Sequence, residues 1–409
     1  MNTFILMLGC FDTKEEDFSF LYECLKGLGE NIITINTGVM GTTQNFPIDF
    51  ESDLVAEQGG SSIQELRKKK DRGHAMAVMG AGTAKLVSKL VRENKIKAAI
   101  GMGGGGGTFI ALMAMREIPL GIPKLCVSTL AGKDISRQIG SKDITLMPSI
   151  VDVAGLNSIS KPLIRQAAAA ISAMAGVINT DVDETIGSIA ISVFGNTSVC
   201  VDKCSELLKA NGYEVFAFHA NGVGGRTMES LIREGCFDAV LDITTTELAD
   251  ELCGGICSAG PDRLNAAIKS AVPQVVVPGC LDMVNFGHLD TVPARYRERQ
   301  VYSWAPDVTL MRTNKEENKI LGEQLVKKLS HATAPVTIVL PAKGLSQIDA
   351  EGGVFYRPDI DRVLFDTIKE NIKGTVNVIE VDAHINDEKF SILLVSTILA
   401  MIEKQKCNK

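Results

Sequence analysis

A run of five glycines in the first half of the chain has the composition and context of an anion-binding turn. Gly103–Gly107 follow an apolar strand pattern and precede a helix pattern that starts at Thr108. Glycine has no Cβ, so its backbone can take positive φ and a bulky anion can approach its N–H groups. A helix N-terminus adds unpaired N–H groups and the positive end of the helix dipole. The alternative is a flexible linker, but linkers seldom lie between a buried strand and a helix. The pattern predicts a phosphate-binding turn.

The surrounding motifs narrow the class of phosphate ligand. Gly101, Gly103 and Gly106 satisfy G-x-G-x-x-G, although five glycines in a row satisfy many such patterns. A dinucleotide site also needs an acidic residue after the next strand, and that strand ends in Ser128 and Thr129. The chain contains no G-x-x-x-x-G-K-[ST] motif of a P-loop. The expectation is a mononucleotide bound without a P-loop.

A second polar group follows the first predicted strand. Asp12 and Thr13 stand where a helix starts, and capping that helix is their simplest role. Lys14 is a cation in the first turn, where it opposes the helix dipole. It suits a bound phosphate, with an exposed aliphatic stem as the alternative. If a nucleotide binds here, Asp12 is the candidate ligand for Mg²⁺.

Polar residues also follow the predicted strands of the second half of the chain. Each of them has a structural interpretation as a capping, turn or core residue. As a set they predict a pocket for a carboxylate- or phosphate-bearing metabolite, with three cations to hold the acid and two histidines to handle a proton. The residues are Arg226, Thr245, Arg312 and Lys343 for binding, and His219 and His384 for proton transfer.

Strand and helix patterns that alternate along the whole chain must position these groups. Continuous apolar strands separated by helices predict parallel sheets covered on both faces, and so an α/β fold with two Rossmann-like domains. A polar, turn-like stretch at 177–185 places the boundary between domains 1–182 and 183–409, with the ligand cleft between them. The predicted strands are 4–9, 31–37, 96–101, 124–129, 144–148, 188–195, 213–220, 239–244, 274–279, 308–312, 336–341 and 376–381. The predicted helices include 15–28, 72–94, 108–116, 160–175 and 387–404.

Composition limits the partners. The chain has 409 residues and a net charge of −7, which does not favour a nucleic-acid backbone or an anionic membrane surface. No apolar stretch reaches the length of a membrane-spanning helix. The ten cysteines lie mostly within strand and helix patterns and lack the paired spacing of a zinc site. We expect buried, reduced thiols in a cytoplasmic protein.

Several long blocks resemble one family, that of the ATP-binding domain of the tomato tobamovirus-resistance protein and its stand-alone bacterial relatives. The resemblance spans essentially the whole chain. It rests on Asp12-Thr13-Lys14, the glycine run ending in Thr108, LGIPK, PSIVDVAGLNSISK, FHANGVGGRTMESL, VLDITTTELAD, LDMVNFG, LMRTNKEEN and HINDEKF.

This resemblance implies two Rossmann-like domains, ATP binding by the first domain and a homodimer. It places ATP contacts on Lys14, Thr37, Arg72 and Gly104–Gly107. One departure is Gly105, where the family's turn carries a serine. Two functions remain open: an enzyme that uses ATP on a small acid across the interdomain cleft, and a nucleotide-responsive binding protein without turnover.

Overall fold

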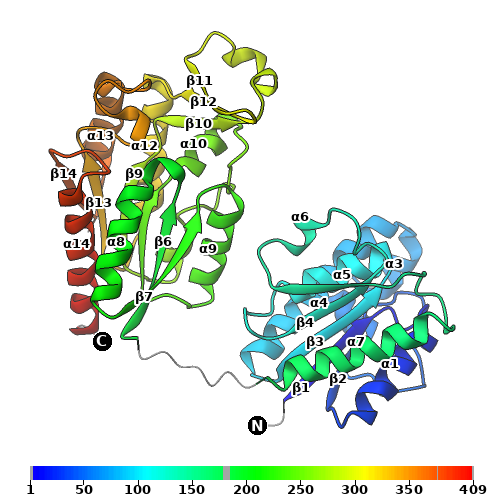
Figure 1. Ribbon diagram of the computed structural model, residues 1–409. Helices are drawn as coiled ribbons and strands as arrows, with labels where there is room; N and C mark the ends of the chain where they lie inside the picture. The colour runs from blue at the N-terminus through cyan, green and yellow to red at the C-terminus, as the bar shows by residue number, and fades with distance from the viewer. Residues whose placement is uncertain (1–2, 178–184, 375, 408–409) are drawn as a thin grey trace. The chain divides into compact units, whose positions relative to one another are not determined.

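The computed structural model describes residues 3–177, 185–374 and 376–407 (Figure 1). The chain forms two compact units, Met1–Val182 (unit 1) and Asp183–Lys409 (unit 2). Most of the predicted boundary stretch at 177–185 lies outside the described residues.

Unit 1 is built on a five-stranded sheet in the order β2-β1-β3-β4-β5, and all its strand pairs are parallel. Along β1, Ile5 and Met7 pack into one core and Leu6 and Leu8 into another, so the strand is apolar on both faces. That is why the strands read as continuous apolar runs. The strands are β1 (Phe4–Gly9), β2 (Ile32–Asn36), β3 (Ile96–Gly103), β4 (Lys124–Ser128) and β5 (Ile144–Pro148).

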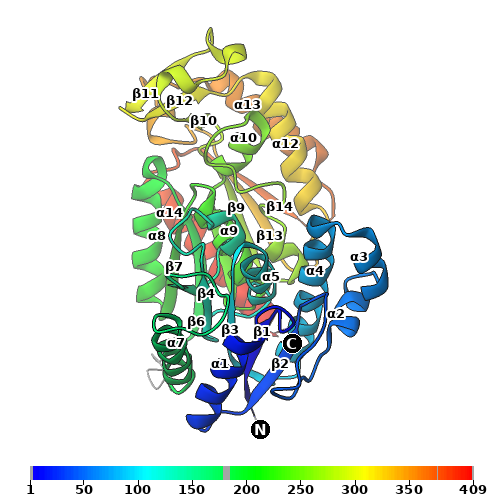
Figure 2. The same ribbon diagram turned by 90° about the vertical axis from the view of Figure 1, so that its right-hand side faces the viewer.

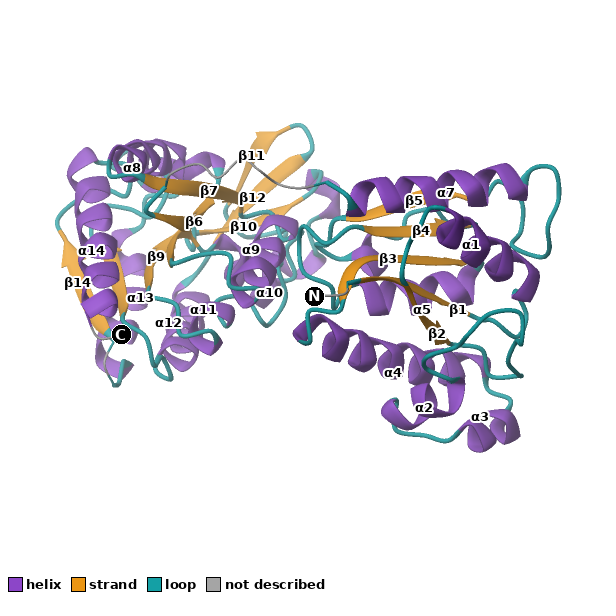
Figure 3. Ribbon diagram, turned by 90° about the horizontal axis from the view of Figure 1, so that it is seen from below, coloured by secondary structure: helices purple, strands orange, loops and turns teal. Residues whose placement is uncertain are grey.

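Helices cover both faces of this sheet (Figure 3). Two helices, α1 and α7, lie against one face, and α4 and α5 pack together on the other with α2 outside them. The helices are α1 (Glu15–Gly27), α2 (Ser52–Gln58), α3 (Ile63–Lys69), α4 (Arg72–Arg92), α5 (Gly105–Met115), α6 (Ser136–Ile139) and α7 (Ser160–Ala175).

The strand order of unit 1 predicts where a ligand binds. The chain leaves β1 toward β2 on one side and later returns to β3 on the other, so the order reverses between β1 and β3. In open parallel sheets ligands bind beyond the carboxyl ends of the strands at such a switch point. The two loops that meet there contain Lys14 and the glycine run.

Unit 2 contains a six-stranded parallel sheet in the order β14-β13-β9-β8-β6-β7. Its strands are β6 (Gly187–Val193), β7 (Tyr213–His219), β8 (Ala239–Thr244), β9 (Gln274–Gly279), β13 (Val336–Pro341) and β14 (Asn377–Val381). One face packs against α8 and α14, and the other against the remaining long helices, of which α12 and α13 lie side by side (Figure 2). The helices are α8 (Ser198–Ala210), α9 (Val223–Arg233), α10 (Thr246–Cys253), α11 (Ala266–Lys269), α12 (Lys315–Leu329), α13 (Pro358–Asn371) and α14 (Glu388–Cys407).

A separate antiparallel sheet lies beside the carboxyl ends of these strands. It has the order β10-β12-β11 and consists of β10 (Met283–Phe286), β11 (Val301–Ala305) and β12 (Val308–Arg312). The segment 308–312, expected in the parallel sheet, is therefore wrongly placed by the sequence pattern: a short meander reads like a buried parallel strand because it too is apolar.

The predicted fold class is confirmed: both large sheets are parallel and helix-covered, in a Rossmann-like α/β arrangement. The final helix, α14, packs on the sheet of unit 2 through Leu394 and Ile398. No helix in the described part of the chain combines the length and apolar character needed to cross a membrane.

Candidate functional site

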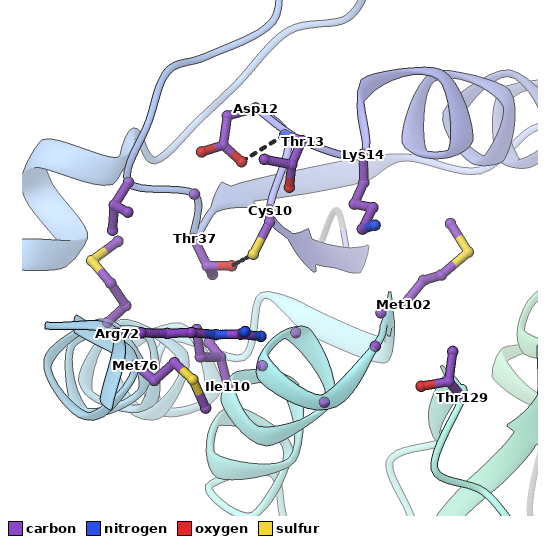
Figure 4. Close-up of a pocket in the computed structure, with 18 of the residues that line it drawn as sticks. Cys10, Asp12, Thr13, Lys14, Thr37, Arg72, Met76, Met102, Ile110 and Thr129 are labelled. Atoms are coloured by element: carbon purple, nitrogen blue, oxygen red, sulfur yellow. Dashed lines mark hydrogen bonds between the residues drawn. The ribbon is translucent and has the colours of Figure 1, made fainter. Parts of the chain in front are cut away.

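A large cavity opens at the switch point of unit 1, with a volume of about 1170 Å³ (Figure 4). Loops that follow all five strands of the sheet line it. Its lining includes Cys10, Asp12, Thr13, Lys14, Thr37, Arg67, Arg72, Met76, Met79, Met102, Gly103–Gly107, Ile110, Ser128, Thr129, Ser149 and Asp152. Nearly every residue predicted to contact a nucleotide therefore lines one cavity.

The glycine run starts helix α5. Gly104 is its N-cap residue, and Gly105 to Gly107 form its first turn with no side chain capping the free N–H groups. None of these glycines has a positive φ. Of the two properties of glycine named above, positive φ is therefore not used here. A Cβ on Gly105 would meet no protein atom within 4 Å, so its absence leaves open space beside the N–H groups. The helix N-terminus is bare and faces the cavity.

Two residues of the run are structural. A Cβ on Gly103 would lie only 2.9 Å from the Cα of Gly107, so this close turn requires glycine. Thr108 is buried and does not line the cavity. Its hydroxyl donates to the Gly103 carbonyl at 3.1 Å and lies 2.7 Å from the Ser128 hydroxyl. Thr108 therefore fixes the turn to β4.

Lys14 and Arg72 reach into the cavity from two sides (Figure 4). Lys14 is the N-cap residue of α1, and Arg72 is the first residue of α4. A nitrogen of the Arg72 guanidinium lies 3.5 Å from the point that a Cβ on Gly106 would occupy. Neither side chain makes an ion pair or hydrogen bond with the residues that the structure describes. Two cations and a bare helix N-terminus thus face the same space.

Asp12 joins the loops at one end of the cavity. One carboxylate oxygen accepts from the Thr13 N–H and the other from the Met40 N–H, both at 2.7 Å. The capping role considered for Asp12 is absent, since Lys14 is the N-cap residue. Thr37 is buried, with its hydroxyl 3.5 Å from the Cys10 sulfur. Burial raises the pKa of the Cys10 thiol above its usual value.

Sequence reasoning missed the apolar part of the cavity. Met76 and Met79 line it together with Ile110, and Leu66 adds a fourth apolar side chain. The signal was available: Arg72, Met76 and Met79 are spaced i, i+4 and i+7, so they share one face of α4. Arg67, in the last turn of α3, also lines the cavity and donates to the Val39 carbonyl.

The second glycine-rich turn, at the start of α9, has a different environment. Glu247 accepts from the Gly222 N–H at 2.7 Å and the Gly225 N–H at 3.2 Å. A Cβ on Gly225 would lie 2.1 Å from a Glu247 oxygen. The protein's own carboxylate therefore occupies the place that an anion takes at a helix N-terminus. Glu247 in turn pairs with the fully buried Arg263 at 2.6 Å.

Arg312 is enclosed by protein groups. It lies on β12, outside the parallel sheet, and is only 2% exposed. Its guanidinium pairs with Asp361 at 2.6 Å and Asp349 at 3.4 Å, and donates to the Phe355 carbonyl at 2.8 Å. Burial and the neighbouring carboxylates raise the pKa of Asp349 to about 9. These contacts account for Arg312 without a ligand.

The other residues predicted to bind an acid also have protein partners. Arg226 donates to the Ser258 carbonyl at 2.9 Å, and Lys343 forms an exposed ion pair with Asp382 at 3.0 Å. Thr245 is fully buried and donates to the Val277 carbonyl.

The two histidines are not brought together. His219 ends β7 and stacks on Phe194, whereas His384 follows β14 and lies 2.9 Å from the Ser346 carbonyl. These strands are the opposite edges of a six-stranded sheet, so roughly 24 Å separates them at the usual strand spacing. The second-unit pocket remains a prediction: its three cations have protein partners, and its two histidines follow strands at opposite edges of the sheet.

No group of three or more His, Cys, Asp or Glu side chains that could hold a metal ion occurs in the described ranges. All ten cysteines are free thiols. A metal at the cavity of unit 1 would need oxygen ligands from something bound there.

Fold and site define a Rossmann-like α/β protein of two units, with an open cavity at the switch point of the first. The chain belongs to the uncharacterised protein family UPF0261, whose N-terminal domain matches residues 3–180 and whose C-terminal domain matches residues 187–402. It is 45% identical over 408 residues to a UPF0261 protein of Clostridium tetani, covering 99% of this chain and all of that protein.

The resemblance drawn from the sequence blocks is thereby confirmed. The ToMV resistance protein Tm-1(GCR237) of Solanum lycopersicum is 33% identical over 430 residues, which is 98% of this chain and 56% of that protein. A thioesterase domain from the curacin biosynthetic pathway is 13% identical with a TM-score of 0.27, over 52% of this chain and 90% of that chain.

Proposed function

We propose that unit 1 binds ATP in the cavity at its switch point, beyond the carboxyl ends of β1 and β3. One observation carries the proposal: Lys14, Arg72 and the uncapped start of α5 face the same cavity, and neither cation has a described partner. Charge-assisted bonds from Lys and Arg, with N–H groups at a helix N-terminus, are the usual means of holding phosphates.

The apolar side of the cavity supports a purine. Leu66, Met76 and Met79 offer the polarizable, apolar surface against which a flat base packs. The strand after the glycine turn ends in Ser128 and Thr129, with no carboxylate to hold the ribose of a dinucleotide. The resemblance of the motifs to an ATP-binding family supports the same ligand.

The contacts in unit 2 favour a nucleotide-responsive protein over an enzyme that acts on a small acid. An acid-binding pocket needs cations that are free to pair with a ligand, but Arg312 is held by Asp361 and Asp349. An enzyme that acts on a small acid would require Arg312 to exchange Asp361 and Asp349 for the carboxylate or phosphate of its substrate. Incubation with MgATP tests it: a binding protein leaves the nucleotide intact, and stoichiometric turnover supports the enzyme.

We further propose that the protein is cytoplasmic and forms a homodimer. The ten free thiols, six of them buried, suit the reducing cytoplasm. A homodimer is implied by the family resemblance, and sedimentation of the full chain tests it.

Calorimetric titration of the full chain tests ATP binding. We expect one site per chain, affinity that falls from ATP to ADP to AMP as phosphates are removed, and no tighter binding of NADH. Absence of binding by ATP, or equal affinity for adenosine, would overturn the proposal.

A further inference from the structure

An unexplained carboxylate lies beside the glycine turn. Asp152, in the loop after β5, lines the cavity, and its Oδ1 lies 3.7 Å from the point that a Cβ on Gly104 would occupy. The hydroxyl of Thr129 lies 3.7 Å from the same point. An acid and a hydroxyl therefore flank the N-cap of α5, where the phosphates of the proposed nucleotide bind. A carboxylate there repels phosphate unless a cation lies between them.

We propose that Asp152 and Thr129 bind the divalent cation, Mg²⁺, that accompanies the nucleotide. This inference rests on the proposed ATP site. Mg²⁺ in nucleotide sites keeps several waters and takes one or two protein oxygens plus phosphate oxygens. A hydroxyl and an aspartate at the end of a strand are such a pair, as in P-loop proteins, although this chain lacks that loop.

Asp17 supplies independent support. It is 1% exposed, and its Oδ1 is buried without a hydrogen-bond partner, while Oδ2 accepts from the Gly155 N–H at 2.9 Å. Asp17 lines a small second cavity together with Asp152 and Ser149, which both also line the large one. A buried carboxylate oxygen without a donor suits a water bound to a cation at Asp152. Burial raises the pKa of Asp17 because it disfavours the charged carboxylate. Asp17 is a positioning residue in this arrangement.

Asp12, the aspartate expected from the sequence to bind Mg²⁺, is less suited. Both of its oxygens already accept backbone N–H groups, from Thr13 and Met40, and so join two loops. Asp152 accepts only the Val153 N–H, at 2.9 Å through Oδ1, from the described residues. Its Oδ1, beside the glycine turn, keeps a second lone pair, and its Oδ2 accepts no hydrogen bond from the described residues, so the carboxylate can bind an ion.

The experiment measures ATP affinity of the full chain by calorimetry with Mg²⁺ and with EDTA. In the wild type we expect Mg²⁺ to tighten ATP binding about tenfold or more. In Asp152→Asn this ratio should fall toward one, while affinity in EDTA is kept or improved because a negative charge is lost. Asp53→Asn, an exposed aspartate on α2 outside the cavity, is the matched control and should keep the wild-type ratio.

A second measurement uses Mn²⁺ as the probe. The EPR spectrum of Mn²⁺ with ATP should change on adding wild-type protein and change less with Asp152→Asn. Three results distinguish failure of the metal site from failure of ATP binding. A wild-type ratio of one, or loss of the ratio in Asp12→Asn but not in Asp152→Asn, overturns the metal site alone. Wild-type protein that binds ATP in neither condition overturns the proposed function.

Discussion

Lys14 and Arg312 are both cations at strand ends, yet their surroundings differ. Lys14 has no described partner and lies beside a bare helix N-terminus, whereas Arg312 is caged by Asp349 and Asp361. The sequence indicated that Lys14 lacks a structural role, since a lysine at a helix start opposes the helix dipole. Nothing near Arg312 in the sequence indicated its acids, because Asp349 and Asp361 lie 37 and 49 residues away.

Lys14→Ala should weaken ATP binding by about 1.5–3 kcal/mol, the range of a hydrogen bond to a charged group. The loss follows from removing one of two unpaired cations at the phosphate position. Calorimetry measures it, with Lys26→Ala on the same helix as the control. Unchanged affinity would show that Lys14 is only a surface cation.

Asp250 predicts a pH dependence of stability. Burial raises its pKa to about 7, with Asn285 and two backbone N–H groups acting in the opposite direction. The folded pKa lies above the unfolded one, so the unfolded chain binds fewer protons between them. Stability should therefore fall as pH rises from about 4 to 7, by up to about 1.4 kcal/mol per pH unit from this group.

Asp250→Asn should abolish that slope. The amide of the variant keeps the oxygen that accepts from the Cys257 N–H. In the wild type the Asn285 Oδ1 has no hydrogen-bond donor, and in the variant an amide flip lets it accept from the new side-chain N–H. Urea unfolding of both proteins across this pH range gives the difference in unfolding free energy. A difference that does not change with pH contradicts the assignment to Asp250.

Among the elements, two helices that begin with a glycine-rich turn, α5 and α9, have different surroundings at their N-termini. The start of α5 is open toward a cavity, and the start of α9 is filled by Glu247. The sequence predicts an anion-binding turn at the start of α5, which stays a prediction, whereas at the start of α9 the structure shows a carboxylate of the protein itself. No local pattern could predict this internal carboxylate, because Glu247 follows β8, which is separated from β7 by β6 in the sheet.

Gly105→Ala should raise stability and lower ATP affinity. Gly105 is in a helical first turn without positive φ and a Cβ there meets no atom within 4 Å, so alanine should stabilise unit 1 by up to about 1 kcal/mol. The new methyl enters the space where phosphate approaches. Thermal unfolding and calorimetry measure the two effects, with Gly27→Ala in α1 as the control. A variant with unchanged ATP affinity would contradict the role given to the turn.

Glu247→Ala should destabilise unit 2 without affecting ATP binding. It removes one acid from the fully buried Arg263 and leaves two backbone N–H groups of the α9 turn unpaired. Breaking a buried pair in this way costs about 3–5 kcal/mol. Glu247→Gln keeps an acceptor and should cost less. If the alanine variant unfolds at the wild-type urea concentration, the internal-anion account is wrong.

At the scale of the molecule, the alternation of strands and helices was enough to predict two parallel α/β sheets. The position of the unit 1 site followed, because the edge of a parallel sheet collects the strand-end loops. The spacing of Arg72, Met76 and Met79 indicated a shared helix face, but only the tertiary structure showed that this face and Asp152, in the loop after β5, line the cavity. The sequence-based prediction was least accurate in unit 2. There β12 belongs to the separate antiparallel sheet, so Arg312 does not lie at the edge of the parallel sheet.

We propose that ATP binding in the cavity of unit 1 depends on Lys14, Arg72 and the start of α5. The most direct test is calorimetric titration of MgATP into the full wild-type chain and into Lys14→Ala/Arg72→Ala. We expect the double variant to keep the wild-type melting profile and to lose at least about 100-fold in affinity, since two charge-assisted bonds are removed. Equal affinity of the two proteins, or no binding by the wild type, would contradict the claim.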